Sequence, residues 1–190
     1  MNRKEIVNFF RQVEGFLRPT TEDWAKAVGT QGVYAWYSDL SLATHANPTV
    51  PVDGPWRIGD FLLLYIGIVT QRPIKNRLSF AAGRGRADQH LVPMGLGCLL
   101  SNTLGIELRH GKQPGFLVFV PRKPLQNWIA DHVCFKYLET KEAKALEPML
   151  ITELRPLLNL EYNEQHPFYT VINNTIHLHK NQAKTLPRIE

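Results

Sequence analysis

The chain has 190 residues, a formal net charge of +5 and 44% hydrophobic residues. This length suits one sizeable hydrophobic core but is short for two, and the composition excludes a fibrous or generally disordered protein. The basic balance fits a polyanionic partner such as nucleic acid, although many basic proteins bind none.

The N-terminus and the cysteines bear on cellular location. The first residues lead into an amphipathic pattern and do not resemble a secretory leader. The longest apolar runs fall far short of the roughly 20 residues that a membrane helix needs, so we expect no membrane partner. Cys98 and Cys134 stand outside any CxxC pair or zinc-type spacing, and we therefore expect two buried thiols in a cytoplasmic protein.

The first half of the chain alternates helical and strand patterns. An amphipathic helix is expected from the N-terminus to near Pro19, followed by a capped helical turn at residues 21–29. Residues 32–37 and 61–69 are rich in β-branched and aromatic side chains, which predicts two strands. Residues 38–59 between them contain several prolines and predict a long irregular insertion.

The second half of the chain predicts shorter elements and a tail without clear periodicity. In chain order they are a helix from Pro73 through Ala81, a basic connector at residues 84–88, a helix at 95–104, strands at 106–109 and 116–120, a helix at 124–131, a strand at 133–138 and a helix that ends at Pro156. For the tail we expect a final strand or hairpin at residues 171–178 and a frayed segment at residues 180–190.

Four fragments occur in a fixed order along the chain. Gly32-Val33-Tyr34 and Tyr65-Ile66-Gly67 are each a common way of writing a strand, so neither is specific alone. Asn76-Arg77-Leu78 follows, and then Glu147 with Asn159 after eleven intervening residues and Pro156 shortly before that asparagine. In this joint order the fragments resemble the GIY-YIG nuclease family over roughly residues 32–159.

The resemblance implies an α+β fold, with a small antiparallel sheet of three strands flanked by helices. The two tyrosines would lie on adjacent strands, and the metal-binding glutamate on a late helix. We expect an N-terminal helical addition at residues 1–30, the nuclease domain at residues 31–160 and a C-terminal extension at residues 161–190.

The resemblance also implies a metal-dependent endonuclease that hydrolyses DNA phosphodiester bonds. Glu147 would hold Mg²⁺ or Mn²⁺, which are hard cations that prefer oxygen ligands. Tyr34 would accept a proton from the attacking water, and Tyr65 would orient the phosphate or a metal-bound water. Arg77 would stabilise negative charge developing on the phosphate. Asn159 would fix the framework of the site by hydrogen bonding.

Further residues are expected to contact DNA around this site. Gly67 would let the nucleic-acid backbone approach the sheet closely. Basic and imidazole side chains near the arginine would hold phosphates without reading sequence. The residues in this set are Arg72, Lys75, Arg84, Arg86 and His90.

The chain departs from the family pattern in two places. Tyr34 and Tyr65 are farther apart in sequence than is usual, so residues 38–59 are expected to be an insertion that could contact substrate. Many members also carry histidine or tyrosine one helical turn after the arginine, where this chain has Ala81. His90, beyond the basic connector, would supply the missing group from another direction.

Alternatives remain open for these residues. The same fold could serve as a catalytically weak or inactive module that binds DNA or a protein partner, which Ala81 favours. In an unrelated α+β protein the tyrosines would be ordinary core residues, and Glu147 beside Pro148 would mark the first turn of a helix. His177 and His179 would share one face of the predicted strand at metal-ligand spacing, without an evident third ligand.

Overall fold

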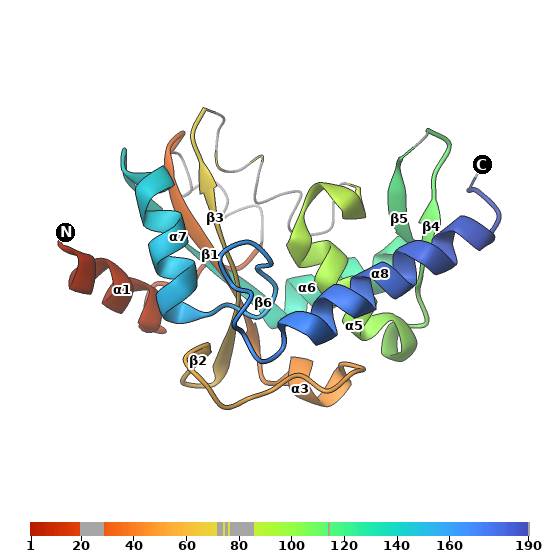
Figure 1. The fold of residues 1–190 in the computed structure, drawn as a ribbon, viewed down its shortest axis with the longest axis horizontal. Helices are drawn as coiled ribbons and strands as arrows, with labels where there is room; N and C mark the ends of the chain where they lie inside the picture. Colours follow the sequence, from red (N-terminus) through yellow and green to blue (C-terminus); the bar gives the residue numbers. More distant parts are fainter. Residues whose placement is uncertain (20–28, 72–73, 75, 77–85, 114, 190) are drawn as a thin grey trace.

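The computed structural model describes residues 1–19, 29–71, 74, 76, 86–113 and 115–189. Figure 1 shows two antiparallel sheets packed with helices, which confirms the predicted α+β class. The helices are α1 (Arg3–Arg11), α3 (Ser41–His45), the short 3₁₀ helix η2 (Ala87–Gln89), α5 (Leu91–Leu104), α6 (Arg122–His132), α7 (Ala143–Leu154) and α8 (Tyr169–Thr185). The strands are β1 (Gly32–Asp39), β2 (Arg57–Ile58), β3 (Phe61–Val69), β4 (Glu107–His110), β5 (Leu117–Val120) and β6 (Val133–Glu139).

Two predicted helical segments fall mainly outside the described residues. They are the turn at residues 21–29 and the helix from Pro73 through Ala81. Within the second segment, Ile74 and Asn76 are described and helical. Apart from the first helix, the other predicted helices and strands up to Pro156 are present, with ends shifted by a few residues.

A four-stranded antiparallel sheet carries the motif tyrosines, with its strands in the order β2-β3-β1-β6. Tyr34 of β1 pairs with Gly67 of β3 on one side and with Tyr137 of β6 on the other. Trp36 pairs with Tyr65 in the same way. Because paired residues point to the same face and every second residue returns to it, these side chains share one face of the sheet.

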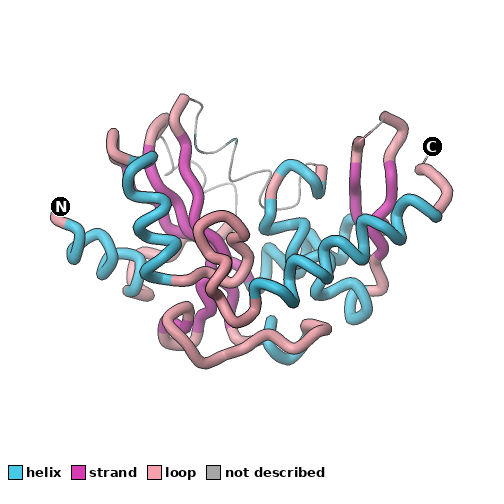
Figure 2. Tube along the Cα trace, viewed as in Figure 1, coloured by secondary structure: helices cyan, strands magenta, loops and turns pink. Residues whose placement is uncertain are grey.

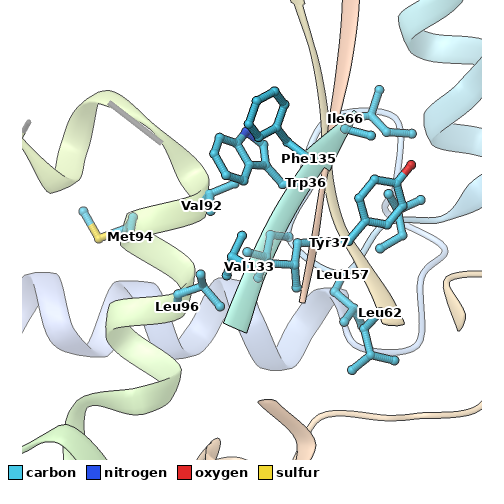
Figure 3. Packing of buried hydrophobic residues seen from close by; sticks show 14 of the residues in the cluster. Trp36, Tyr37, Leu62, Ile66, Val92, Met94, Leu96, Val133, Phe135 and Leu157 are labelled. Atoms are coloured by element: carbon cyan, nitrogen blue, oxygen red, sulfur yellow. The ribbon is translucent and has the colours of Figure 1, made fainter. Parts of the chain in front are cut away.

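Helices cover both faces of this sheet. α7 lies on one side and α5 on the other (Figures 1 and 2). In the core, Trp36 and Phe135 point toward Val92 of α5, whereas Tyr37 points to the opposite side (Figure 3). The hydroxyl of Tyr37 donates to the carbonyl of Phe10 in α1 at 2.9 Å. Since both faces are covered, β1 is buried along nearly its whole length.

The first helix is shorter than predicted. α1 ends at Arg11 and does not continue to the neighbourhood of Pro19. The chain beyond it becomes extended, and Leu17 exchanges two backbone hydrogen bonds of 2.9 Å with Phe135 of β6. This pairing with the sheet replaces the hydrogen bonds that a longer helix would have made.

A buried lysine fastens the end of α1 to the sheet. Lys136 of β6 is 2% exposed, and its ammonium group donates to the carbonyls of Phe9 and Gln12 at 2.6 and 2.7 Å. Those oxygens belong to the helix end, where carbonyls lack a partner within the helix. Burial lowers the pKa of Lys136, so its interactions with the helix end and the neighbouring rings must offset a desolvation cost.

α5 joins the central sheet to the β4–β5 hairpin. It begins directly after His90, earlier than the predicted residues 95–104, because the His90 ring accepts a hydrogen bond from the N–H of Val92 at 3.1 Å. A side chain satisfying a free N–H is what a helix start requires. Gly97 faces the ring of Phe119 in β5, where any side chain would clash. The helix and the hairpin therefore pack in direct contact.

The C-terminal segment is helical, so the predicted strand or hairpin at residues 171–178 is wrong. α8 buries Ile172, Ile176 and Ala183, which fall on one stripe of the helix. It packs against α5 and β4. The β-branched residues that suggested a strand fill one side of a helix, because packing outweighs their weak intrinsic preference.

The predicted fraying of residues 180–190 is also wrong over the part described. α8 continues to Thr185. Beyond it, the N–H of Ile189 donates to the carbonyl of His110 in β4 at 2.9 Å. The tail is therefore fixed to the hairpin.

The structure describes the state of both cysteines and the length of the helices. Cys98 and Cys134 are free and buried, as predicted. Burial raises the pKa of each thiol to about 12, so both stay protonated at neutral pH and are poor nucleophiles. Among the described residues, no helix combines the length and the apolar character needed to cross a bilayer.

A segment without regular structure links α7 to α8 and borders the outer edge of β3. The N–H groups of Leu157 and Leu158 donate to carbonyls of β3 at 3.0 and 2.8 Å. Asn159 continues this pairing with its side chain, which accepts from the N–H of Ile66 at 2.8 Å and donates to its carbonyl at 2.9 Å. The strand is thus held on its outer edge next to Tyr65.

The Asn159 contact can be tested with the substitution Asn159→Asp. A carboxylate oxygen would then face the Ile66 carbonyl, and that buried oxygen would lose its donor. We expect the free energy of unfolding in urea to fall by about 1–3 kcal/mol. The matched control Asn174→Asp changes an exposed residue of α8 and should stay within about 0.5 kcal/mol of the parent. Equal losses in both variants would contradict the contact.

His166 lies in the same linking segment and is a buried neutral imidazole. It is 4% exposed, its ring centroid lies 4.3 Å from that of Trp56, and its Nδ1 accepts from the N–H of Phe168 at 2.9 Å. Burial, and then the charge of Arg155, lower the pKa of His166 from 6.5 to about 4.

This histidine should make the protein sensitive to acid. Between pH 6.5 and 4 the unfolded chain binds a proton that the folded chain does not, so stability is present above this window and is lost as the pH falls through it. We expect a slope of at most about 1.4 kcal/mol per pH unit. Thermal unfolding across this range should show a shallower slope for His166→Asn, which keeps an acceptor, than for the exposed control His177→Asn. Identical slopes would exclude His166 as a cause.

Candidate active site

The structure brings both motif tyrosines together with His90. The Oη atom of Tyr34 lies 3.0 Å from Nε2 of His90. The ring centroid of Tyr65 lies 6.2 Å from that of Tyr34 and 4.9 Å from that of His90. Tyr34 and His90 are buried, at 0% and 5% exposure, whereas Tyr65 is half-buried. Two adjacent strands and the start of α5 thus build one cluster.

The capping contact of His90 determines which ring nitrogen carries the proton. Nδ1 accepts the N–H of Val92, so it has no proton of its own, and the proton of the neutral ring is on Nε2. Nε2 therefore donates to the phenolic oxygen of Tyr34. A hydrogen bond donated to that oxygen favours the phenolate over the phenol.

Gly67 makes room for the two tyrosines. A Cβ atom at this position would lie 2.7 Å from Oη of Tyr34 and 2.6 Å from Cε1 of Tyr65. Any other residue would displace one of these rings. The sequence suggested that Gly67 admits the nucleic-acid backbone, but in the structure tyrosine side chains fill the space that its missing side chain leaves.

Glu147 lies on the stripe of α7 that faces the sheet. Helical spacing groups it with Ala143, Leu150, Ile151 and Leu154, all of which are buried, while Glu147 is half-buried. α7 packs against β3 and β1, the strands that carry the tyrosines. A carboxylate among apolar neighbours loses solvation, which a cation or hydrogen-bond donors must offset.

Glu147 and Tyr34 lie at the same end of the sheet. β1 begins at Gly32, which pairs with Glu139, the last residue of β6, and α7 begins shortly after that residue. Glu147 is the fifth residue of a helix that starts at Ala143, so the alternative that it marks a first turn is wrong. α7 and α5 occupy opposite layers, so α7 carries Glu147 on the other side of the sheet from the layer in which the two phenols meet His90.

A cavity of about 180 Å³ borders Tyr65 and His90. The other described residues that line it are Ala87, Gln89, Leu91, Met94 and Lys180. Lys180 of α8 adds an ammonium group beside a phenol and an imidazole, and this combination suits a phosphate oxygen. Sequence reasoning missed Lys180 because the segment that carries it was expected to be frayed.

The predicted DNA contacts are only partly described. Arg72, Lys75, Arg77 and Arg84 lie outside the described residues, as does Ala81. Arg86 donates from Nη2 to the carbonyl of Gly115 at 3.0 Å, and its guanidinium lies 4.8 Å from the ring centroid of Phe116. It therefore contacts the hairpin turn. His90, also expected to contact DNA, lies against Tyr34 and borders the cavity beside Tyr65.

The two C-terminal histidines do not share a face. Both lie on α8, where residues two apart point in different directions. His179 is half-buried, with Nε2 at 3.4 Å from Oγ of Ser101, and burial lowers its pKa. His177 is exposed. The metal pair considered for a strand is therefore wrong.

Glu147 offers one carboxylate, an oxygen ligand of the kind that hard divalent cations prefer. Within the ranges that the structure describes, no three His, Cys, Asp or Glu side chains gather to hold an ion. A cation held by one carboxylate must complete its shell with water and substrate oxygens, which is how Mg²⁺ is usually bound. A structural zinc site, which needs four protein ligands, does not fit this set.

Comparison with known proteins identifies the family of the chain. A family model described as the GIY-YIG catalytic domain matches residues 32–181, which is most of the chain and includes Tyr34, Tyr65, Glu147 and Lys180. Searches of curated proteins and of solved structures found no match. The chain therefore belongs to the GIY-YIG family of nucleases.

Proposed function

We propose that the protein is a metal-dependent endonuclease that cleaves DNA, with Tyr34, Tyr65, Arg77 and Glu147 in its active site. The observation that carries this proposal is the contact of the two motif tyrosines with His90, at the end of the sheet where α7 carries Glu147. Phenols and a carboxylate placed around one end of a sheet are suited to activating water beside a phosphate.

Glu147 is the residue that we assign to metal binding. Mg²⁺ or Mn²⁺ bound there would stabilise negative charge on the phosphate and make a coordinated water easier to deprotonate. The half-buried position of the carboxylate limits competing water and strengthens its attraction to a cation. Arg77 would pair with non-bridging phosphate oxygens through its planar fork of donors.

Tyr34 is the proposed general base. The hydrogen bond from His90 stabilises the phenolate, which is the form that can accept a proton from the attacking water. Because Tyr34 is fully buried, surrounding side chains must shift when DNA binds for water to reach it. His90 thus takes the place of the histidine or tyrosine that the family usually carries where this chain has Ala81.

Tyr65 and Lys180 are proposed to hold the phosphate. Tyr65 is half-buried and borders the cavity that Lys180 also lines, so both can reach a ligand there. Asn159 supports this arrangement by holding Ile66, the residue after Tyr65. We place the nuclease domain at residues 31–160, with residues 1–30 and 161–190 as additions.

The full burial of Tyr34 also favours a second candidate function. A chain whose phenol stays enclosed would bind DNA through the same fold and cleave it slowly or not at all. DNA binding that weakens with salt, without cleavage in Mg²⁺ or Mn²⁺, would support this binding module over the nuclease.

Nicking of supercoiled plasmid in Mg²⁺ or Mn²⁺ tests the site. Tyr34→Phe removes the proposed base, and Glu147→Gln removes the charge that holds the cation, so each should slow cleavage by about 100-fold or more. Tyr162→Phe and Glu161→Gln change exposed residues of the same types and should cut at the parent rate. Cleavage at the parent rate by both site variants would refute the assignment.

Two substitutions separate the contacts that His90 makes. His90→Asn keeps an acceptor that can cap α5 but cannot place a donor at the position of Nε2. His90→Gln can place a donor there but caps the helix poorly. We expect His90→Asn, which keeps the cap but loses buried ring volume, to lose less stability than His90→Gln and to cleave more slowly than the parent. The rise of its pH–rate profile should move to higher pH because the phenolate is less stabilised.

His90→Gln should show the opposite pattern, with a lower unfolding temperature and more of the parent activity. A purely structural His90 would instead make activity follow stability in both variants. Parent cleavage and an unchanged pH profile for His90→Asn would remove His90 from the proposal.

A further inference from the structure

The turn of the β4–β5 hairpin and the start of α6 carry basic side chains outside the tyrosine site. Lys112 in the turn and Arg122 in α6 are exposed and line a cavity of about 280 Å³. The other described lining residues include Gln113 and Phe116, and none of them is acidic. Lys123, also exposed, follows Arg122.

The charge of this cluster is not neutralised within the described part of the chain. There, the side chains of Lys112, Arg122 and Lys123 make no hydrogen bond or ion pair. On the neighbouring strand, by contrast, Arg109 is paired with Glu107 through an Nε contact of 2.8 Å. An unpaired basic cluster around a concave surface attracts anions.

The position of two of these cations in α6 opposes helix stability. Arg122 and Lys123 stand in the first turn of α6, which contains no acidic residue. Cations are disfavoured at this positive end of the helix dipole. Helix stability therefore does not account for these two cations. A bound anion would offset their unfavourable interaction with the helix dipole and their mutual repulsion.

The cluster is connected to the tyrosine site through Arg86. Its hydrogen bond to Gly115 and its stacking on Phe116 fix it against the hairpin turn. Arg86 immediately precedes η2, which packs against β5 and leads to His90. In Figure 1 the hairpin turn and the end of the sheet that carries Tyr34 point to the same side of the molecule.

We propose that Arg86, Lys112, Arg122 and Lys123 form a basic hairpin surface that binds the phosphate backbone of duplex DNA next to the cleavage site. This proposal rests on DNA being the substrate of the nuclease. Four cations from the hairpin turn and two adjoining segments give a spread of charge that suits successive phosphates along one strand.

The packing of the hairpin indicates backbone contact without base reading. A free two-stranded ribbon can enter the major groove, but Leu108 and Phe119 of this hairpin are buried, and Phe119 lies against Gly97 of α5. The strands of the hairpin are thus packed, and the exposed residues Lys112, Gln113 and Gly115 lie in its turn. The basic hairpin surface therefore adds affinity that is independent of sequence and sensitive to salt.

Fluorescence polarisation with a labelled DNA duplex in EDTA measures this surface without cleavage. Lys112→Gln and Arg122→Gln should each weaken binding, and each should reduce the slope of log affinity against log salt by about 0.9, the value for one lost phosphate contact. The control Lys4→Gln removes an exposed charge from α1, on the far side of the molecule, and should keep the parent slope.

Each outcome decides for or against the basic hairpin surface. Parent slopes for both hairpin variants, or an equal change in Lys4→Gln, would overturn it. If Tyr34→Phe abolishes cleavage while the hairpin variants keep the parent slope, the nuclease proposal stands and this one fails. If no protein cleaves DNA but the hairpin slopes fall, the surface stands and the nuclease proposal fails.

Discussion

The hydrogen bond between His90 and Tyr34 joins the two layers on which the site depends. One ring nitrogen of His90 caps α5 and the other contacts the phenol on β1. The start of a helix and the environment of the proposed base are therefore set by the same side chain. Any shift of α5 relative to the sheet moves the His90 donor away from Tyr34. The packing of α5 against the sheet therefore affects the proposed base directly.

This bond depends in turn on exact packing around β3. Gly67 leaves the space in which the rings of Tyr34 and Tyr65 sit, and Asn159 holds the outer edge of the strand with both ends of its amide. Each of these residues is small or has paired donors and acceptors, because a buried sheet tolerates neither extra volume nor unpaired polar atoms. Gly67 and Asn159 thus maintain the geometry around the two tyrosines.

The two strands that carry the tyrosines could be predicted from the sequence. β1 and β3 are rich in strand-forming residues, and their tyrosines belong to a motif with a fixed order. The stripe position of Glu147 is also visible in its spacing from Leu150 and Leu154. The contact of His90 could not be predicted, since it joins residues 56 apart and histidine is not a typical capping residue. α8 was mistaken for a strand because its β-branched residues masked a helical spacing, and Lys180 was lost with it.

The topology also determines which additions to the core lie near the proposed DNA-cleavage site. Residues 38–59, expected to be an insertion that could contact substrate, leave the sheet at Asp39, which pairs with Phe61. Tyr34, which pairs with Gly67, lies five residues before Asp39 on β1. At the rise of an extended strand, this separates the two positions by about 17 Å. α3 and β2 thus lie beyond the opposite end of the sheet from α7's first turn, as Figure 1 shows. A duplex engaged at the tyrosine end would run toward η2 and the hairpin instead, so the second layer is better placed than the insertion to position the substrate.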